Sequence, residues 1–234
     1  VGLFMDKASS VRLAHLTVHG SWTKNAPSDA SNGIRFNGGN DHQVTNVVVT
    51  GFYNGVRFDA YIRPGIWVSS TTNKLLNSTI SGCARGCMVN STSKGSELRG
   101  NRIYDNKDYG VWIVNNSYDT FLTQNVIGSR DVDLGNGYGI QVSAVSQGGV
   151  RIVNNTIIGN RYIGVSVASN ATVSLITRNN ILGNKDYNIR FSPRLIPPCP
   201  SAFTDSALPA DQRQLAHDNW YGAADIAIAA GLIS

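Results

Sequence analysis

Short runs in which apolar and polar residues alternate recur along the chain, and each run starts at a glycine. In Gly164-Val165-Ser166-Val167, two valines flank a serine. Such alternation predicts a β-strand with one buried face. The chain therefore repeats one strand-containing unit, which begins at Gly2, Gly33, Gly55, Gly86, Gly110, Gly139 and Gly164, with Asn188 in an eighth copy.

A polar residue marks a bend ahead of a second apolar run in each unit. These positions are 24–31 residues apart: His15, Asn46, Asn77, Asn101, Asn125, Asn155 and Asn179. A unit of this length cannot bury its apolar face alone and must stack on its neighbours. With three short strands per unit, we expect an all-β fold, a parallel β-helix (solenoid) of about seven coils over residues 1–192. The stacked bend residues would form a ladder of amide hydrogen bonds.

The composition fits a β-solenoid, with 24 Gly and only 15% charged residues. No apolar run approaches the roughly 20 residues that span a bilayer, so no membrane span is expected. The net charge of +5 favours a polyanionic partner. Lys and Arg form no run and do not interleave with aromatic residues, so nucleic acid is not an expected partner.

The three cysteines do not have the spacing of a disulfide framework. Cys83 and Cys87 are four residues apart, and Cys199 lies near the end of the chain. We expect them to pack as buried free thiols. A Cys83–Cys87 bridge is the alternative, and no His lies close enough in sequence to suggest a metal site.

The repeat stops after Phe191, where four prolines that cannot continue a strand ladder follow: Pro193, Pro197, Pro198 and Pro200. Residues 193–234 are therefore predicted to form a C-terminal capping segment, with a short helix over residues 209–217. At the other end, residues 2–5 match residues 33–36, so the sequence starts inside a coil. This predicts further N-terminal coils or a domain before Val1.

The segment Asn101–Val111 carries a recognisable motif, Asn-Arg-Ile-Tyr-Asp-Asn-Lys-Asp-Tyr-Gly-Val. It resembles the right-handed parallel β-helix repeat of the pectate-lyase-like superfamily, and Asn155–Val165 fits equally well. The resemblance covers residues 1–192 and implies a right-handed β-helix. Because polysaccharide lyases, glycoside hydrolases, epimerases and bacteriophage tailspikes share this repeat, it also implies a polysaccharide partner. A tailspike relative would form a homotrimer.

The same resemblance places the glycine strands in the first sheet, whose outer face commonly carries the saccharide cleft. The motifs of particular members are missing. The sequence lacks the polygalacturonase set (Asn-Thr-Asp, Asp-Asp, Gly-His-Gly, Arg-Ile-Lys) and the Asp-Pro-His of alginate epimerases. The resemblance therefore indicates the fold and leaves the reaction open.

Three insertions interrupt the repeat. The usual interval from bend to glycine is nine residues, but His15 to Gly33 is eighteen and Asn125 to Gly139 is fourteen. The added residues fall around 21–31 and 129–136, and a third excursion covers residues 60–72. By the superfamily assignment, these loops flank the first sheet on both sides and wall a groove over it. Long loops in a compact repeat are commonly functional.

Alternation in the glycine strands predicts one outward column: Phe4, Arg35, Arg57, Met88, Trp112, Gln141, Ser166 and Arg190. Sugar rings stack on aromatic faces, and guanidinium groups bind carboxylates or sulfates. We therefore expect carbohydrate contacts from a set of residues on or beside this column: Arg35, Arg57, Asp59, Trp112, Gln141, Arg190 and Trp67. A decorated surface, or an interface with another chain, is the alternative.

Candidate catalytic residues are the aspartates near the insertions. A glycoside hydrolase needs two carboxylates roughly 5–9.5 Å apart. Asp131 or Asp133 could meet Asp105 or Asp108 across adjacent coils, although each could simply form a turn. A lyase would need a base and a cation at the uronate, for which Arg35, Arg57 and His42 are available. No cofactor is predicted, although a lyase could use Ca²⁺.

Three functions remain open from the sequence. The first is a depolymerase of an acidic or cell-surface glycan, lyase or hydrolase, tailspike-like or secreted. The second is a non-catalytic glycan-binding adhesin or receptor-binding spike, and the third is a structural solenoid whose loops dock another subunit. The first two place the protein outside the cell, secreted or on a virion surface.

Overall fold

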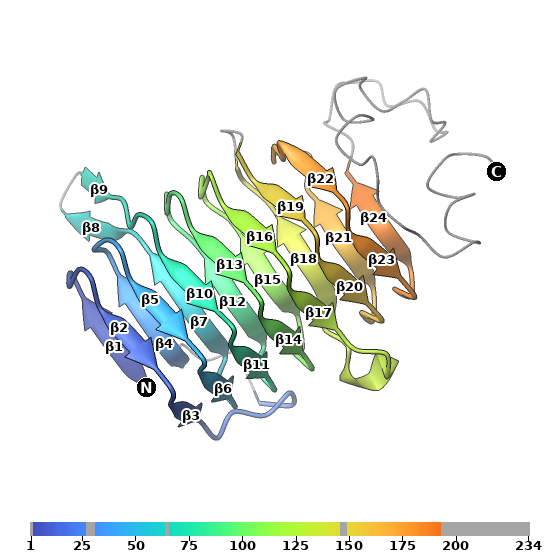
Figure 1. The fold of residues 1–234 in the computed structure, drawn as a ribbon, viewed down its shortest axis with the longest axis horizontal. Coiled ribbons are helices and arrows are strands. Elements are labelled where there is room, and N and C mark those ends of the chain that lie inside the picture. Colours follow the sequence, from blue (N-terminus) through green and yellow to red (C-terminus); the bar gives the residue numbers. More distant parts are fainter. Residues whose placement is uncertain (1, 27–30, 64–65, 146–148, 193–234) are drawn as a thin grey trace.

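The computed structural model describes residues 2–26, 31–63, 66–145 and 149–192 (Figure 1). The chain winds into stacked coils, and each complete coil adds one strand to each of three parallel sheets. This is the parallel β-helix that the repeat predicts. The C-terminal segment, with Cys199 and the predicted helix over residues 209–217, lies outside the described residues.

Sheet A contains eight strands, one from each coil and one from the eighth copy: β1 (Leu3–Asp6), β4 (Asn32–Asn37), β7 (Asn54–Asp59), β12 (Arg85–Val89), β15 (Tyr109–Ile113), β18 (Tyr138–Val142), β21 (Ile163–Val167) and β24 (Tyr187–Phe191). Sheet B follows in each coil: β2 (Arg12–Ala14), β5 (Gln43–Thr45), β10 (Lys74–Leu76), β13 (Glu97–Arg99), β16 (Phe121–Thr123), β19 (Arg151–Val153) and β22 (Leu175–Thr177). Sheet C completes the coil: β3 (Thr17–His19), β6 (Val48–Thr50), β11 (Thr79–Ser81), β14 (Arg102–Tyr104), β17 (Val126–Gly128), β20 (Thr156–Ile158) and β23 (Asn180–Leu182). Coils are numbered here by their sheet A strand, from coil 1 at β1 to coil 8 at β24.

The repeated glycines are required by the close stacking of the coils. A Cβ atom on Gly110 would lie 2.7 Å from the carbonyl oxygen of Gly139, and one on Gly139 would lie 2.5 Å from that of Gly164. Real Cβ atoms essentially never come so close to another heavy atom. A side chain at this position would therefore push successive coils apart.

The apolar side chains of all three sheets fill the interior. Sheet A contributes Phe36 and Phe58, whose rings stack 5.5 Å apart, and sheet C contributes a fully buried isoleucine column: Ile80, Ile103, Ile127, Ile157 and Ile181. Burying one such side chain stabilises the fold by roughly 1.5–3 kcal/mol. Coils 2 to 7 contribute fully buried apolar side chains, whereas those of coil 1, such as Leu3 and Val18, are partly buried at the end of the stack.

An asparagine ladder runs through the turn between sheets B and C. The Oδ1 atom of Asn125 accepts hydrogen bonds from the backbone N–H and the amide of Asn101. Asn125 in turn donates to Oδ1 of Asn155, 2.9 Å away, and Asn155 donates to Asn179. The ladder is confirmed from Asn101 to Asn179.

The prediction that His15, Asn46 and Asn77 belong to this ladder is wrong by one residue. The pairing of Leu76 with Arg99 places Asn77 beside Gly100 rather than beside Asn101. The three residues have φ of +54°, +54° and +48° and are exposed. They occupy a left-handed backbone position that Asn tolerates well. Ser78 takes the ladder position and accepts the N–H of Val47.

A second ladder, which the sequence analysis missed, stacks in the turn from sheet C to sheet A. It is formed by Asn106, Asn136, Asn160 and Asn184, all buried. Each donates its amide to Oδ1 of the next at 2.8–3.0 Å. Together the two ladders satisfy the buried polar groups of two turns.

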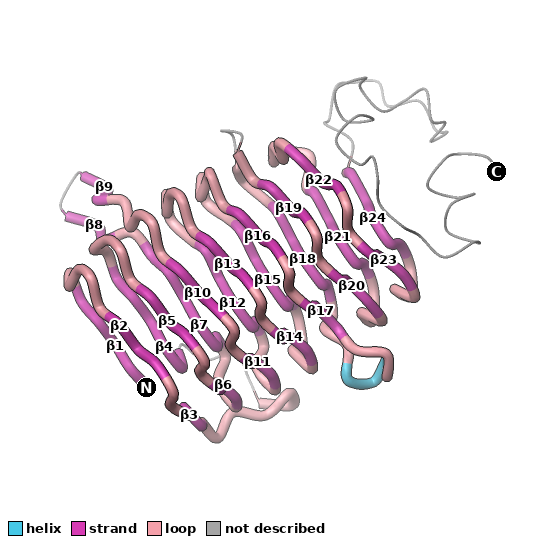
Figure 2. Tube along the Cα trace, in the orientation of Figure 1, coloured by secondary structure: helices cyan, strands magenta, loops and turns pink. Residues whose placement is uncertain are grey.

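The three insertions lie at the two edges of sheet A, as predicted. The first forms a strap, defined here as residues 20–26, which follows β3. The second, residues 129–135, is called the η1 loop because it contains the 3-10 helix η1 (Val132–Leu134), drawn in cyan in Figure 2. The third forms the antiparallel hairpin β8 (Tyr61–Arg63) and β9 (Ile66–Val68) at the opposite edge, toward sheet B.

Cys83 and Cys87 are free and buried, so the alternative of a bridge between them is wrong. Burial raises the pKa of the Cys83 thiol to about 11 and raises the pKa of Cys87 further. Both therefore pack as small apolar side chains.

Candidate functional site

The predicted outward column exists on sheet A. The strand register joins Arg35 to Arg57, Arg57 to Met88, and Met88 to Trp112. It continues from Trp112 through Gln141 and Ser166 to Arg190. The prediction that Arg57, Trp112 and Gln141 share one flank of the solenoid is confirmed.

Aromatic rings form a continuous row along this face, from coil 3 to coil 7. We call this row, together with the arginine within it, the aromatic strip: Tyr53, Arg85, Trp112, Tyr109, Tyr138 and Tyr162. The guanidinium carbon of Arg85 lies 4.9 Å from the ring centroid of Tyr53 and 4.6 Å from that of Trp112. These distances are typical of cation–π contacts.

The strip continues through stacked rings beyond Trp112. Tyr109 lies 5.1 Å from Trp112 with nearly parallel planes. Tyr138 lies 5.5 Å from Tyr109, and Tyr162 lies 5.6 Å from Tyr138. Each of these rings is partly exposed, and Tyr162 is 46% exposed. The strip therefore offers a pre-formed apolar platform across several coils.

Tyr109 is the member of the strip whose ionisation is most affected by its surroundings. Burial raises the pKa of its hydroxyl, and the nearby carboxylate of Asp108 raises it further. The Tyr109 hydroxyl is therefore neutral at physiological pH, so it can donate and accept hydrogen bonds.

Two arginines and one aspartate form a cluster in coils 2 and 3, beyond one end of the strip. Nε of Arg35 lies 2.8 Å from Oδ2 of Asp59, and Nε of Arg57 lies 2.7 Å from the same atom. Asp59 is only 2% exposed. Arg57 and Asp59 lie on the same side of the strand, as predicted, but Asp59 lies beneath the arginines and is not open to a ligand.

The strap and the η1 loop form one wall along the edge of sheet A toward sheet C. The strap crosses the turns of coils 2 and 3, where the N–H of Trp22 donates to the carbonyl of Gly51. Lys24 then forms an ion pair with Asp105 in coil 4. The N–H of Asp105 donates to the carbonyl of Leu134 in the η1 loop at 2.7 Å.

Other contacts fix this wall in place. The Trp22 ring packs edge-on against Tyr53 at the end of the aromatic strip, 6.0 Å away. From the turn between coils 6 and 7, the Arg161 guanidinium donates to the carbonyls of Gly135 and Asn106. Both inserted loops are therefore joined to the solenoid beside the strip.

The four candidate catalytic aspartates lie along this wall, but their surroundings differ. Asp105 is paired with Lys24, and Asp131 accepts the N–H of Asp133 at the start of η1. Asp131 and Asp133 are exposed, whereas Asp108 is half-buried next to Tyr109. The adjacency of coil 4 and the η1 loop agrees with the expectation. The catalytic roles remain predictions.

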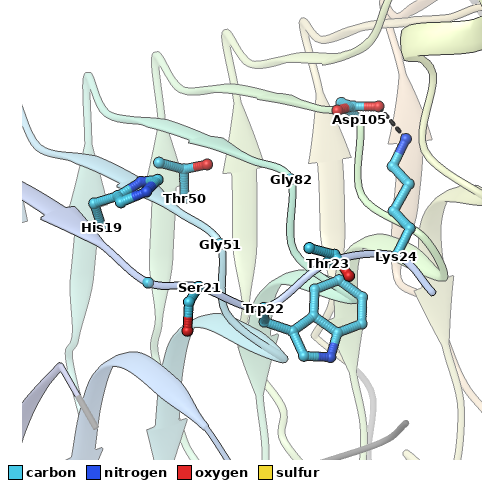
Figure 3. Close-up of a pocket in the computed structure, with 10 residues that line it drawn as sticks. His19, Ser21, Trp22, Thr23, Lys24, Thr50, Gly51, Gly82 and Asp105 are labelled. Atoms are coloured by element: carbon cyan, nitrogen blue, oxygen red, sulfur yellow. Dashed lines mark hydrogen bonds and ion pairs between the residues drawn. The ribbon is translucent and has the colours of Figure 1, made fainter. Parts of the chain in front are cut away.

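A shallow hollow of about 590 Å³ lies beside the strap (Figure 3). His19 and Thr50 lie at one end of the hollow, and the Lys24–Asp105 pair lies at the other. Trp22 is only 8% exposed, so little of its ring is available to a ligand there. Much of the remaining lining is main chain at Gly20, Gly51 and Gly82. The hollow has fewer convergent functional groups than sheet A.

The other predicted contact residues have different surroundings. Gln141 is half-buried beside Trp112, and Arg190 packs over Tyr187 in coil 8. The backbone of Trp67 lies in β9, and its side chain is outside the described part of the chain. His42, considered as a base for a lyase, is fully buried and stacks on Phe36, so it cannot reach a bound glycan.

The tyrosines of the strip and Arg85 were missed by sequence reasoning. Arg85, Tyr109 and Tyr138 each stand directly before a repeat glycine, so a signal was present at a fixed offset. The outward column was read only from residues after the glycine. The Lys24–Asp105 pair had no sequence signal, because 81 residues separate its members.

The part of the chain that the structure describes has no helix with the length and apolar character needed to cross a bilayer. Over residues 2–26, 31–63, 66–145 and 149–192, no three His, Cys, Asp or Glu side chains come together to form a metal-binding group.

Comparison with known proteins supports the architecture. The family model described as "Right handed beta helix region" matches residues 1–185. Among solved structures, the Azotobacter vinelandii mannuronan C-5 epimerase AlgE6 A-module is similar, with a TM-score of 0.61 and 18% sequence identity. The match covers 80% of this chain and 49% of that one, so the chain spans about half of the epimerase module. No curated protein matches the chain.

Proposed function

The chain belongs to the right-handed β-helix family, and we propose that it binds an acidic polysaccharide along the outer face of sheet A and acts on it. The aromatic strip is the observation that carries this proposal. Its rings are partly exposed and already packed in place, so a glycan that stacks on them loses little affinity to ordering of the protein.

The charges on sheet A favour an acidic glycan. Arg35, Arg57 and Arg85 lie on the same face as the strip. Guanidinium groups bind carboxylates and sulfates through charge-assisted hydrogen bonds. The structurally similar epimerase module is named for mannuronan, a polyuronate. A polymer with uronate residues is therefore the first substrate class to test.

Elimination or epimerisation at a uronate requires neutralisation of its carboxylate and removal of the proton on the adjacent carbon. Arginines of sheet A supply the positive charge. Asp108 is the carboxylate next to the strip, and the neutral Tyr109 hydroxyl beside it can relay a proton. Asp131 and Asp133 on the η1 loop are the alternative carboxylates. On this proposal the protein works outside the cell, where its polymer is found.

Binding without catalysis is the second candidate, and one observation favours it. Asp105 is engaged by Lys24, and Asp131 caps η1, so two of the four candidate aspartates have structural partners. An adhesin would use the same strip and would need no pair of free carboxylates.

The test is a panel of purified polysaccharides: polyuronates, sulfated glycans and neutral glycans. Unsaturated products identify a lyase, new saturated reducing ends a hydrolase, and a changed uronate configuration without cleavage an epimerase. Binding with no product identifies an adhesin. If catalysis occurs, replacing Asp108 with Asn, or Asp131 and Asp133 together with Asn, shows which carboxylates take part.

Trp112→Ala tests whether the strip is the binding surface. We expect a loss of affinity of about two- to tenfold, since stacking on one aromatic ring contributes about 0.5–1.5 kcal/mol beyond area burial. Phe121→Ala is the matched control, because Phe121 packs under Arg151 in a similar pair on sheet B. Equal losses in both variants, or no binding of any glycan by the unmodified chain, would contradict the proposal.

A further inference from the structure

We infer that Arg35 and Arg57 form a subsite for one acid group of the glycan, a carboxylate or a sulfate ester, and that Asp59 and Asn90 are positioning residues for it. This inference rests on the proposed function, because it takes the glycan to lie on sheet A. It adds that the acid group occupies coils 2 and 3, at one end of the aromatic strip.

One buried carboxylate fixes both guanidinium groups. Asp59 accepts Nε–H of Arg35 and Nε–H of Arg57, each at 2.8 Å. Asp59 also accepts a hydrogen bond from the side-chain amide of Asn90 at 2.7 Å. Asn90 in turn accepts a hydrogen bond from the side-chain amide of Asn115 at 2.9 Å, which fixes its orientation. Charge-assisted bonds of this length are strong. The two arginine side chains therefore hold one orientation before any ligand arrives.

The terminal groups of both arginines remain available. Within the described residues, the Nη atoms of Arg35 and Arg57 have no hydrogen-bond partner. The Arg35 side chain is 31% exposed and that of Arg57 is 23% exposed. The planar Nη edge of a guanidinium matches the two oxygens of a carboxylate or sulfate. Two arginines and one aspartate also leave a net charge of +1 in the cluster.

The surroundings of the cluster suit a subsite. The Arg35 guanidinium lies 5.5 Å from the ring of Phe4, which supports it from coil 1. The Asp6 carboxylate, also in coil 1, accepts a hydrogen bond from the amide of Asn37 at 2.7 Å. The β8–β9 hairpin starts two residues after Asp59 and borders the cluster on the sheet B side.

The cluster lies at a useful distance from the strip. Arg57 and Trp112 occupy one outward column with Met88 between them. Two strand spacings separate them, or about 10 Å. A glycan that stacks on Trp112 and runs along the column therefore places a sugar about two units further on over Arg57, and the acid group of that sugar sets the direction of the chain along the solenoid.

The experiment measures binding of the full chain to three probes: polygalacturonate, the same polymer with its carboxyl groups reduced, and a sulfated neutral glycan. Arg57→Gln and Arg35→Gln should each weaken binding of the polyuronate at least tenfold and leave binding of the reduced polymer unchanged. The sulfated probe shows whether sulfate esters are accepted as well as carboxylates. Arg99→Gln is the matched control, because Nε of Arg99 binds Glu97 at 2.8 Å on sheet B.

Asp59→Asn separates positioning from simple electrostatics. This change removes a negative charge, so charge alone predicts tighter binding of the polyuronate. Loss of positioning predicts weaker binding, and that is the expected result. If the variant does not fold, Arg57→Lys gives the same test, because lysine keeps the charge and loses the Nε contact. We expect it to lose the preference for the acidic polymer.

The outcomes distinguish this inference from the proposed function. If the unmodified chain binds both polymers equally through Trp112, the glycan-binding function stands and the acid subsite is wrong. Equal effects of Arg57→Gln and Arg99→Gln would likewise overturn it, since general surface charge would then explain binding. If no glycan binds at all, both proposals fail.

Discussion

Lys24 and Asp105 form an ion pair across 81 residues of sequence, joining the strap that leaves coil 1 to the turn that leaves coil 4. Asp105 also contacts the η1 loop, because its backbone N–H donates a hydrogen bond to the carbonyl of Leu134. Its φ is +58°, and other coils have glycine at the equivalent turn position, for example Gly82 in coil 3 and Gly159 in coil 6. An aspartate thus stands in a left-handed position at the point where two loops converge.

Lys24→Ala should loosen the strap with little loss of global stability. The two side chains are 37% and 25% exposed, and such pairs contribute about 0.2–1 kcal/mol. Faster hydrogen exchange at the Trp22 amide and faster proteolysis in the strap should report the change. Lys74→Ala, which removes a pair with Glu97 at 3.5 Å on sheet B, is the control. If both variants leave strap exchange unchanged, the ion pair does not hold the strap.

Gly139→Ala should destabilise the stack by about 1–3 kcal/mol or more. The new Cβ atom would lie 2.5 Å from the Gly164 carbonyl, so coils 6 and 7 must separate. Gly183→Ala is the comparison, since a Cβ atom there meets nothing within 4 Å and only the φ of +62° opposes it. Urea unfolding of both variants should rank Gly139→Ala as clearly the less stable. A reversed order would refute the steric explanation of the repeat.

Asn155→Ala should lower the free energy of unfolding by about 1–3 kcal/mol for each buried donor that is left without an acceptor. The change removes the Oδ1 atom that accepts both the N–H and the amide of Asn125. Asn154→Gly, at the exposed left-handed position one residue earlier, should be close to neutral. Thermal unfolding of the pair tests whether ladder and bend positions have the separate roles that the register shows.

His42 should make the fold less stable at acid pH. Burial lowers its pKa below the ordinary 6.5, an effect that Arg12 strengthens and that the Gly38 carbonyl and Asp41 oppose. Below pH 6.5 the unfolded chain takes up a proton at His42 that the folded chain does not. The free energy of unfolding therefore decreases as the pH is lowered from 6.5 to the pKa of His42 in the folded state. Above pH 6.5 both states are neutral, and the contribution is constant.

Urea unfolding at pH about 7.5 and about 5.5 measures this slope. His42→Phe keeps a ring beside Phe36 and should show a smaller loss of stability between the two pH values. An unchanged slope in His42→Phe would show that other groups cause the acid sensitivity.

The fold could be predicted from the sequence because its causes are local and repeated. Only glycine fits where the carbonyl of the next coil approaches, so glycines such as Gly110 and Gly139 mark coils 1 to 7. The bend residues were less informative. Asn suits both a ladder and a left-handed backbone position, and Asn46 and Asn77 serve the second purpose, which placed the predicted ladder one residue too early in coils 2 and 3.

The site was predicted only in part, for a related reason. Alternation after each glycine located Arg57 and Trp112, because strand geometry fixes where those side chains point. Tyr109 stacks on Trp112 although the two are three residues apart, so simple alternation does not extend backwards across the glycine to Tyr109 or Tyr138. Long-range pairs such as Lys24 with Asp105 depend on loop paths that no periodic pattern describes.

The strap changes how the solenoid should come apart. In an ordinary stack each coil meets only its neighbours, so fraying can begin at an end and advance one coil at a time. Here residues leaving coil 1 are anchored at coil 4, and the same anchor holds a loop of coil 5. Unravelling of coil 1 must therefore break the strap contacts with coils 2 and 4 as well as the strand pairing with coil 2, so the strap resists fraying at this end and protects the edge beside the aromatic strip.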